Sequence, residues 1–180
     1  MTNWPLGIGA AKLLEFAVDT AASSGVDILS ATTANTKGAW TQLVDGASGL
    51  TALDGILLLV RTTTNANYSM DIAIGAAAAE VIVCENIFIP VSNSVLGSVF
   101  LELPIAIPAA TRIAVRTQAD GSNAAKRVDV IGIGMQGGEI YQIGFAGTDS
   151  IGYISATTKG TSVDCGVTAH TKGSYSQLIA

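Results

Sequence analysis

A two-residue alternation of apolar and polar side chains is the feature of this sequence that most restricts its fold. Between positions 99 and 107 every second residue is aliphatic: Val99, Leu101, Leu103, Ile105 and Ile107. Shorter stretches around Ile72, Ile113 and Val128 follow the same period. Successive side chains of a β-strand point to opposite faces of its sheet, so this period places one aliphatic set on a buried face. The pattern therefore predicts strands along most of the chain.

Turn residues separate these runs at short intervals, as at Asn65-Ala66-Asn67 and Asp120-Gly121-Ser122-Asn123. Further strands are predicted at Gly55–Thr62, Glu80–Pro90, Ile140–Phe145 and Ser174–Ile179. Roughly eight to ten short strands, with turns about every 8–12 residues, are typical of a sandwich or a barrel. We expect an all-β fold, a jelly-roll-like antiparallel β-sandwich of two packed sheets with a short N-terminal arm.

Two segments depart from the strand pattern. Ala10 to Val18 mixes apolar and charged residues in a way that suits a short helix or an extended arm. Gly75 to Glu80 is Ala-rich and has a helical composition, but it is short and leads directly into a strand. We expect an N-terminal arm over residues 1–24, a β-sandwich domain over residues 25–146 and a C-terminal extension over residues 147–180.

Low charge is the most unusual property of the composition. Charged residues make up 13% of the chain and hydrophobic residues 49%, whereas a soluble domain carries about twice that charge. We therefore expect much of the surface to be uncharged sheet or to be covered by other copies of the protein. The nine Lys and Arg residues are scattered through a chain of net charge −5 and form no basic stripe, so no nucleic-acid partner is expected.

The sequence carries no signal for a membrane partner. Its most apolar short run, Ile56 to Val60, is far shorter than the ~20 residues that a membrane-spanning helix needs. The first residues, Met1-Thr2-Asn3-Trp4-Pro5, contain neither a basic region nor the apolar core of a signal peptide. Export by that route and contact with a membrane are therefore not expected.

A motif of twelve residues occurs twice. Thr33–Val44 reappears as Thr168–Ile179, 135 positions later, and both copies contain Thr-Lys-Gly-x-aromatic-x-Gln-Leu. The Lys-Gly pair predicts a turn, where glycine supplies a backbone conformation that other residues avoid, and an alternating strand follows. The separation is about one β domain. The second copy therefore either opens a further domain or supplies a strand to a sheet of this chain or of a neighbouring subunit.

Two interpretations of the repeated motif compete. In the structural interpretation it is a hairpin that enters the edge of a sandwich. In the functional interpretation it is a ligand-binding corner with an aromatic platform. We favour the structural interpretation, because we expect no acidic or basic cluster to converge on either copy.

Three segments of the chain resemble β-rich virion proteins of tailed bacteriophages. They begin at Thr36-Lys37-Gly38, at Asp71-Ile72-Ala73-Ile74-Gly75-Ala76-Ala77 and at Ile107-Pro108-Ala109-Ala110-Thr111-Arg112. In such proteins, segments of the form TKGxWxQL, DIAIGAAxxE and IPAGTRIAxR mark one domain that can be repeated in tandem. The resemblance covers about residues 25–135, and this sequence differs in having Ala110 where the pattern has Gly. It implies a structural role in the phage particle and provides no catalytic residues.

One glycine pattern imitates a nucleotide-binding motif without its context. Gly132-Ile133-Gly134-Met135-Gln136-Gly137 is a literal G-x-G-x-x-G that follows the strand around Val128. In dinucleotide-binding folds these glycines open a helix. Here the continuation from Gly138 to Phe145 is a strand pattern, and no βαβ unit surrounds it. We therefore expect a strand that ends in a glycine turn, and no bound nucleotide.

Other candidates for catalytic or metal chemistry are isolated in the sequence. His170 is the only histidine, and the first copy of the repeated motif has Asn35 in its place, so a catalytic role is not expected. Cys84 and Cys165 lack metal-ligand spacing and are expected to be free, buried thiols. We expect no enzymatic activity, no catalytic residue, no cofactor and no metal site.

Two functions fit these properties. The first is a capsid decoration or cement protein, a homotrimer that binds the major capsid protein on the outside of the head and clamps it through the arm of residues 1–24. The second is a tail-fibre or receptor-binding module that recognises host surface glycans, suggested by Tyr68 and the aromatic positions of the repeated motif. Both place the protein in the virion. The residues predicted to contact partners are Trp4, Leu6, Leu13, Leu14, Phe16, Trp40 and Tyr175.

Overall fold

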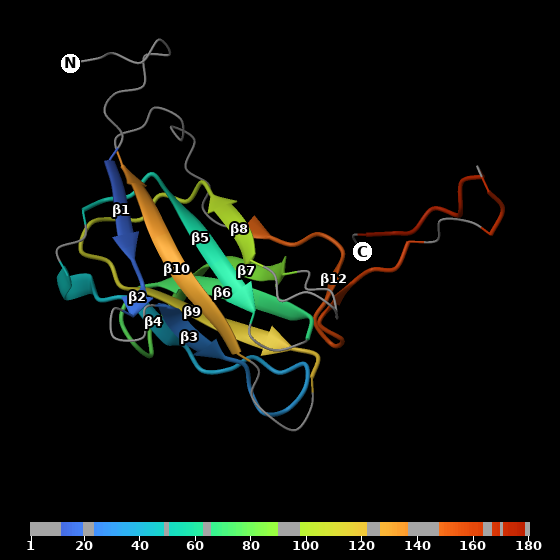
Figure 1. Cartoon of the computed structure of the whole chain (residues 1–180), viewed down its shortest axis with the longest axis horizontal. Helices are drawn as coiled ribbons and strands as arrows, with labels where there is room; N and C mark the ends of the chain where they lie inside the picture. Colours follow the sequence, from blue (N-terminus) through green and yellow to red (C-terminus); the bar gives the residue numbers. More distant parts are fainter. Residues whose placement is uncertain are drawn as a thin grey trace, which may run out of the picture.

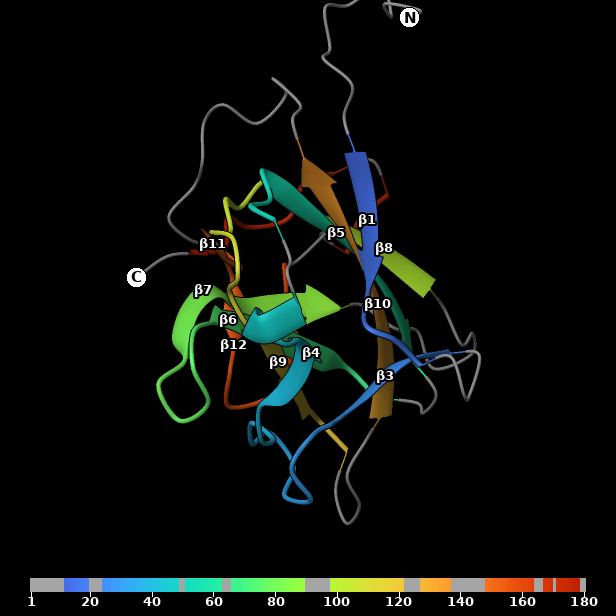
Figure 2. The ribbon, with the colours of Figure 1, turned by 90° about the vertical axis from the view of Figure 1, so that its left-hand side faces the viewer.

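Two β-sheets packed face to face form the body of the molecule, seen edge-on in Figure 2. The computed structural model describes residues 12–19, 24–48, 51–62, 66–89, 98–121, 127–136, 148–163, 167–169 and 171–178. Within these ranges the regular structure is β-strand, apart from one 3-10 turn at Gly46–Ser48. No helix in these ranges has the length and apolarity needed to cross a membrane. The all-β prediction is confirmed.

The first sheet has the strand order β2-β3-β10-β5-β8, with β1 paired to the second half of β10 (Figure 1). Its strands are β1 (Lys12–Phe16), β2 (Val18–Asp19), β3 (Ser24–Leu29), β5 (Gly55–Thr62), β8 (Ser98–Leu103) and β10 (Arg127–Gln136). The second sheet has the order β11-β7-β6-β9-β4. Its strands are β4 (Thr41–Val44), β6 (Tyr68–Ile74), β7 (Val81–Ile89), β9 (Ile113–Ala119) and β11 (Thr148–Asp149). A separate hairpin joins β12 (Tyr153–Ile154) to β13 (Lys159–Gly160).

The pairing of the strands identifies the topology as a jelly roll. From β3 to β10 the first strand pairs with the last, the second with the next to last, and so inward: β3·β10, β4·β9, β5·β8 and β6·β7, all antiparallel. This long ribbon is rolled up so that alternate pairs share a sheet, through β10·β5 in the first and β6·β9 in the second. Two sheets built in this way form the double Greek key of a jelly roll, as the sequence predicts.

The aliphatic alternation forms the core between the sheets. In β5, Ile56, Leu58 and Val60 are fully buried, while Leu57 and Leu59 between them are only partly buried. In β6 and β9 the core side is lined by large apolar side chains: Tyr68, Met70, Ile72, Ile113 and Val115. Each sheet therefore presents one apolar face to the other, which is the arrangement that a period of two predicts.

Two glycines in β10 make room for side chains that cross the strand. A Cβ atom at Gly132 would lie 2.0 Å from Cε2 of Phe16, and one at Gly134 would lie 2.6 Å from Cδ2 of Leu53. Phe16 and Leu53 belong to the core, with 8% and 1% of their surface exposed. The first two glycines of the G-x-G-x-x-G pattern are therefore packing positions within a strand that runs to Gln136, whereas Gly137 lies outside the described residues.

The structure corrects the two helical alternatives. Lys12–Phe16 is a strand that pairs with β10, so this part of the predicted arm of residues 1–24 lies in the first sheet. Gly75 to Glu80 forms a tight turn between β6 and β7, in which Gly75 (φ 107°) and Ala78 (φ 63°) adopt left-handed backbone conformations. Left-handed residues break a right-handed helix, so the Ala-rich composition does not determine this segment.

Two predicted strands have different outcomes in the C-terminal third. Ile140–Phe145 lies outside the described residues. Residues 174–178 of the predicted strand Ser174–Ile179 contain no β-structure, and Ile179 lies outside the described residues. A strand forms only against a partner, and the described residues place no strand beside this segment.

Gly132→Ala is expected to destabilise the sandwich by about 1–3 kcal/mol, because the new methyl group overlaps the Phe16 ring. Phe16→Ala is expected to cost about 3–5 kcal/mol through lost burial. In the double variant the overlap is absent, so its cost should fall at least about 1 kcal/mol below the sum of the two. Urea unfolding of the four proteins measures these free energies. Additive costs would show that β1 does not pack across Gly132.

Candidate functional site

A row of polar side chains lies on the outer face of β6 and β9. Ser69 and Asp71 alternate with the core residues of β6 and are still fully buried. In the antiparallel register Ser69 faces Gln118 and Asp71 faces Arg116. An outer sheet face is usually solvated, so these side chains are buried because other parts of the chain cover them. The cover is formed by the β3–β4 loop, residues 30–40, and by the β12–β13 hairpin.

Asp71 is the centre of this row. Its Oδ1 accepts hydrogen bonds from Lys37 Nζ and, at 2.8 Å, from the backbone N–H of Asn86. Its Oδ2 accepts from Arg116 Nε at 2.8 Å. Lys37 Nζ also donates to Oδ1 of Asn86 at 2.8 Å. Burial alone raises the pKa of Asp71. The Asn86 N–H, Lys37 and Arg116 together lower this pKa by more than burial raises it, so the pKa lies below its ordinary value.

A β-bulge in β7 brings Asn86 to this carboxylate. Met70 pairs with Ile87 and Ile72 pairs with Cys84, so two residues of β7 stand opposite Asp71. Asn86 has a left-handed backbone (φ 55°), a conformation that asparagine adopts more readily than most residues. Bulges of this kind re-aim side chains and backbone groups next to functional positions.

The first copy of the repeated motif supplies Lys37 and is held tightly against β9. The N–H of Asn35 donates to Ala119 O at 2.7 Å, and the N–H of Gly38 donates to Thr117 O at 2.8 Å. A Cβ atom at position 38 would lie 2.2 Å from the Leu29 carbonyl oxygen, so only glycine fits after Lys37 in this loop. The backbone of the motif therefore fixes the direction in which Lys37 leaves the loop.

Trp40 of the same motif packs against Arg116. The guanidinium carbon of Arg116 lies 4.4 Å from the centroid of the Trp40 ring, within the range of a cation–π contact. Arg116 thus has the ring on one side and the Asp71 carboxylate at its Nε. The half-buried Trp40 covers a charge in its own chain.

Arg112, four residues before Arg116 and directly before β9, makes a second set of contacts. Its Nη1 donates to Oε1 of Glu80 at 3.0 Å and to the Gly75 carbonyl at 3.3 Å. Its Nε donates to Oε1 of Gln42 at 3.0 Å. Arg112 therefore joins edge strand β4, the β6–β7 turn and the start of β9.

These contacts join the three segments that begin at Thr36, Asp71 and Ile107. We call them the motif clamp, which consists of Lys37, Trp40, Gln42, Asp71, Glu80, Arg112 and Arg116. The expectation that no acidic or basic cluster converges on the repeated motif is wrong for its first copy. The alternation in β6 and β9 places Asp71 and Arg116 on the polar faces of their strands. That alternation does not reveal the register that makes them neighbours, and Lys37 comes from a loop.

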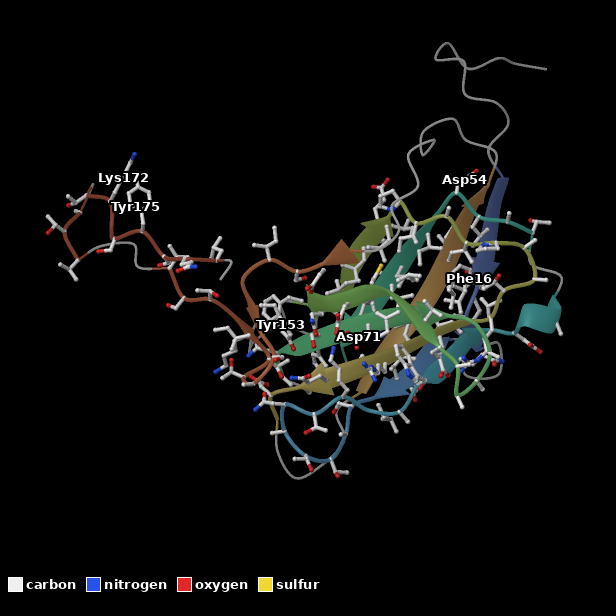
Figure 3. The ribbon with its side chains drawn as sticks, turned by 180° about the vertical axis from the view of Figure 1, so that it is seen from behind. Phe16, Asp54, Asp71, Tyr153, Lys172 and Tyr175 are labelled. Atoms are coloured by element: carbon white, nitrogen blue, oxygen red, sulfur yellow. The ribbon has the colours of Figure 1, made fainter. Side chains whose placement is uncertain are left out.

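A second polar network ties the C-terminal extension to the sandwich. Tyr153 Oη and Ser69 Oγ are 2.6 Å apart. Gln118 Nε2 donates to the fully buried Thr158 at 2.9 Å, and Thr158 Oγ1 donates to Oδ1 of Asn35 at 2.8 Å. Burial raises the pKa of the Tyr153 phenol. The β12–β13 hairpin is thus anchored on the same sheet face as the motif clamp, as Figure 3 shows for Tyr153 and Asp71.

The residues predicted to contact partners lie in different environments. Trp4 and Leu6 are outside the described residues. The backbones of Leu13 and Leu14 pair with Met135 and Gly134 in β1·β10.

The three remaining predicted contact residues are far from equivalent. Phe16 packs into the core of its own sandwich, so its ring is not at the surface in this arrangement. Trp40 lies against Arg116. Tyr175 is fully exposed (107%) on the C-terminal segment, the described residues after Ser162, which extends away from the sandwich (Figure 3).

The second copy of the repeated motif is at the surface. Lys172 and Tyr175 occupy the positions of Lys37 and Trp40, and both are exposed. Val167, just before this copy, is also fully exposed (103%). The same residue types that dock in the first copy are therefore presented to solvent in the second. His170 and Cys165 lie outside the described residues, while Cys84 is buried in the core, as expected.

Comparisons with known proteins give a structural similarity but no match in sequence. No family model matches the chain, and no curated protein matches it. The chain is similar in structure to a chain in the structure of the infectious bursal disease virus Gx strain, with 13% sequence identity and a TM-score of 0.39. The similarity covers 78% of this chain and 38% of the viral chain, so the present chain spans well under half of that protein's length.

Asp71→Asn is expected to lower the free energy of unfolding at pH 7 by about 2–4 kcal/mol, because Lys37 and Arg116 lose their shared carboxylate. The folded pKa of Asp71 lies below its ordinary value of 3.8. The unfolded state therefore binds more protons near this pH, and the unsubstituted chain should lose stability as the pH falls through 3.8 towards the folded pKa. The variant should lack this component. Urea unfolding as a function of pH measures both.

Asp45→Asn is the matched control. Asp45 is exposed, and its Oδ1 accepts from the Ala47 N–H at 3.1 Å, a bond that asparagine can also accept. We expect a change within about 0.5 kcal/mol. Equal losses in the two variants would contradict the role assigned to Asp71.

Proposed function

We propose that this chain is a structural protein of a tailed-phage virion, and specifically a capsid decoration protein that binds the outside of the head. The observation that supports this most is that the three segments resembling phage virion proteins coincide with the motif clamp. The resemblance therefore rests on residues that assemble the fold. Jelly rolls serve as viral capsid and lectin domains, so the topology is compatible with the proposal, although a fold alone does not define a function.

The C-terminal segment is the proposed contact between copies of the protein. Its second copy of the repeated motif presents Lys172 and Tyr175, the counterparts of residues that dock in the first copy. Exposed apolar side chains that gather on one segment are typical of interaction surfaces. Here they are Val163, Val167, Tyr175 and Leu178. Association through this segment produces a homo-oligomer, which we propose is a trimer.

Residues 1–11 are the proposed contact with the major capsid protein. They contain Trp4 and Leu6, and aromatic and aliphatic anchors of this kind dominate the binding energy of many interfaces. Lys12–Phe16 pairs with β10 and so belongs to the first sheet. The arm proposed for binding therefore ends before Lys12, because the following residues are needed in the sheet.

Deleting residues 2–11 tests capsid binding without removing β1. The full chain should co-sediment with purified heads of the phage that encodes it, prepared without this protein. The deletion variant should bind at least about tenfold more weakly, a loss of about 1.4 kcal/mol or more. A variant in which residues 2–11 are replaced by ten Gly and Ser residues controls for length and should bind as weakly as the deletion. Failure of the full chain to bind heads would overturn the proposal.

A chain that ends after Ser162 tests the proposed contact between copies. Light scattering on the full chain should give three times the mass of one chain, while the shortened chain, which keeps β12 and β13, should be monomeric. Tyr175→Ser should shift the full chain towards monomer, whereas Lys159→Ser in β13 should not. An unchanged mass after truncation would show that copies associate elsewhere.

The three aromatic residues that suggested glycan binding lie in three different environments. Tyr68 is fully buried, Trp40 lies under Arg116, and Tyr175 is on the extended C-terminal segment. These three aromatic side chains do not form one platform. Binding to a glycan array that Tyr175→Ala abolishes would nevertheless favour a receptor-binding module over a decoration protein.

A further inference from the structure

The amine of Lys37 and the carboxylate of Asp71, both in the motif clamp, meet the side-chain amide of Asn86. Lys37 Nζ is 2.8 Å from Oδ1 of Asn86 and is also hydrogen-bonded to Oδ1 of Asp71. Since a carbonyl bond is about 1.23 Å long, the amide carbon of Asn86 lies within about 4 Å of the amine. Reacting atoms held about 3–3.5 Å apart are positioned for attack. A small side-chain adjustment of Lys37 brings its nitrogen into that range.

Three separate elements hold these groups, and backbone hydrogen bonds fix each of them. Lys37 leaves a loop that is hydrogen-bonded to β9, Asp71 lies in the middle of the second sheet, and Asn86 sits on the bulge of β7. The Asp71 side chain is fully buried and that of Lys37 is only 20% exposed. Little water reaches the point where they meet, which favours reaction between the protein groups over exchange with solvent.

The two oxygens of Asp71 have different partners. Oδ2 is bound by Arg116 Nε, so the carboxylate is held in one orientation. Oδ1 faces both Lys37 and the backbone of Asn86. The oxygen that points at the amine is therefore the one placed to move protons between Lys37 and the Asn86 amide.

We propose that Lys37 and Asn86 become joined by an intramolecular isopeptide bond, with Asp71 as the proton carrier. Oδ1 of Asp71 takes a proton from Nζ, and the neutral amine attacks Cγ of Asn86. A C–N bond forms between Nζ and Cγ, and the bond from Cγ to Nδ2 breaks. Asp71 passes this proton to Nδ2, which leaves as ammonia. The second proton that Nζ loses as the amide forms goes to the Asp71 carboxylate and then to the departing ammonia, which becomes ammonium. No group is oxidised or reduced, and the side-chain amine and amide become one secondary amide.

The bond fastens the first copy of the repeated motif to the second sheet. It closes a loop between residues that are 49 positions apart and holds the β3–β4 loop over β6. Cross-links of this kind restrict the unfolded chain and so favour the folded state. Lys172 has the same Thr-Lys-Gly sequence but is exposed on the C-terminal segment, so it provides a matched control.

The mass of the intact full chain tests the bond directly. Loss of ammonia should make the chain about 17 Da lighter than its sequence requires. Trypsin should leave residues 13–61, uncut after Lys37, joined to residues 62–112, and fragmentation should locate the branch at Lys37 and Asn86.

The variant Lys172→Arg should show the same mass loss as the unsubstituted chain. Lys37→Arg keeps the positive charge but has no amine nucleophile, so it and Asn86→Ala should have their full sequence masses. Asp71→Asn should slow or abolish the loss.

Three results would overturn the proposal. In the first, the unsubstituted chain has its full mass and gives separate peptides that end at Lys37 and contain Asn86, which identifies the cluster as an ion pair only. In the second, the mass loss persists in Lys37→Arg, which indicates a cyclised asparagine instead of a cross-link. In the third, the branch maps to another lysine. A freshly folded sample followed over several days distinguishes slow formation from absence, because only the former shows the lighter species increasing.

Discussion

The pairing of Asp71 with Arg116 and Lys37 is the constraint on which the second sheet depends. A buried carboxylate is costly unless cations and hydrogen-bond donors compensate it. A shift of β6 by one residue would turn Asp71 into the aliphatic core and expose Met70 or Ile72. The register between β6 and β9 is therefore selected twice, by apolar burial on the inner face and by charge on the outer face. The β3–β4 loop and the bulge of β7 complete the compensation.

Much of the sandwich follows from the sequence, and the exceptions have identifiable causes. Gly55–Thr62 forms a strand with the predicted bounds, because its alternation and flanking turns are both local signals. The motif clamp was not predicted, since Lys37 and Asp71 are 34 positions apart and only the register brings them together. Lys12–Phe16 is a strand because Gly132 leaves space for Phe16, a long-range fit. The stretch 174–178 matches a strand pattern but has no partner strand among the described residues.

The two copies of the repeated motif show how one sequence depends on its surroundings. In the first copy, Lys37 and Trp40 are held by Asp71 and Arg116, which come from strands elsewhere in the chain. In the second copy, Lys172 and Tyr175 are exposed. The motif thus acts as a docking segment whose conformation is set by an acceptor sheet. Docking of this kind underlies both the proposed association through the C-terminal segment and the proposed cross-link, but the cross-link requires no second copy of the chain.

Asp71 and Arg116 together stabilise the register of the second sheet. A double-mutant cycle with Asp71→Asn, Arg116→Gln and the combined variant measures their coupling free energy from equilibrium unfolding. We predict a coupling of at least about 1 kcal/mol, because each substitution alone leaves a buried or partly buried charge without its partner. A coupling near zero would contradict the account, since the two side chains would then contribute to stability independently.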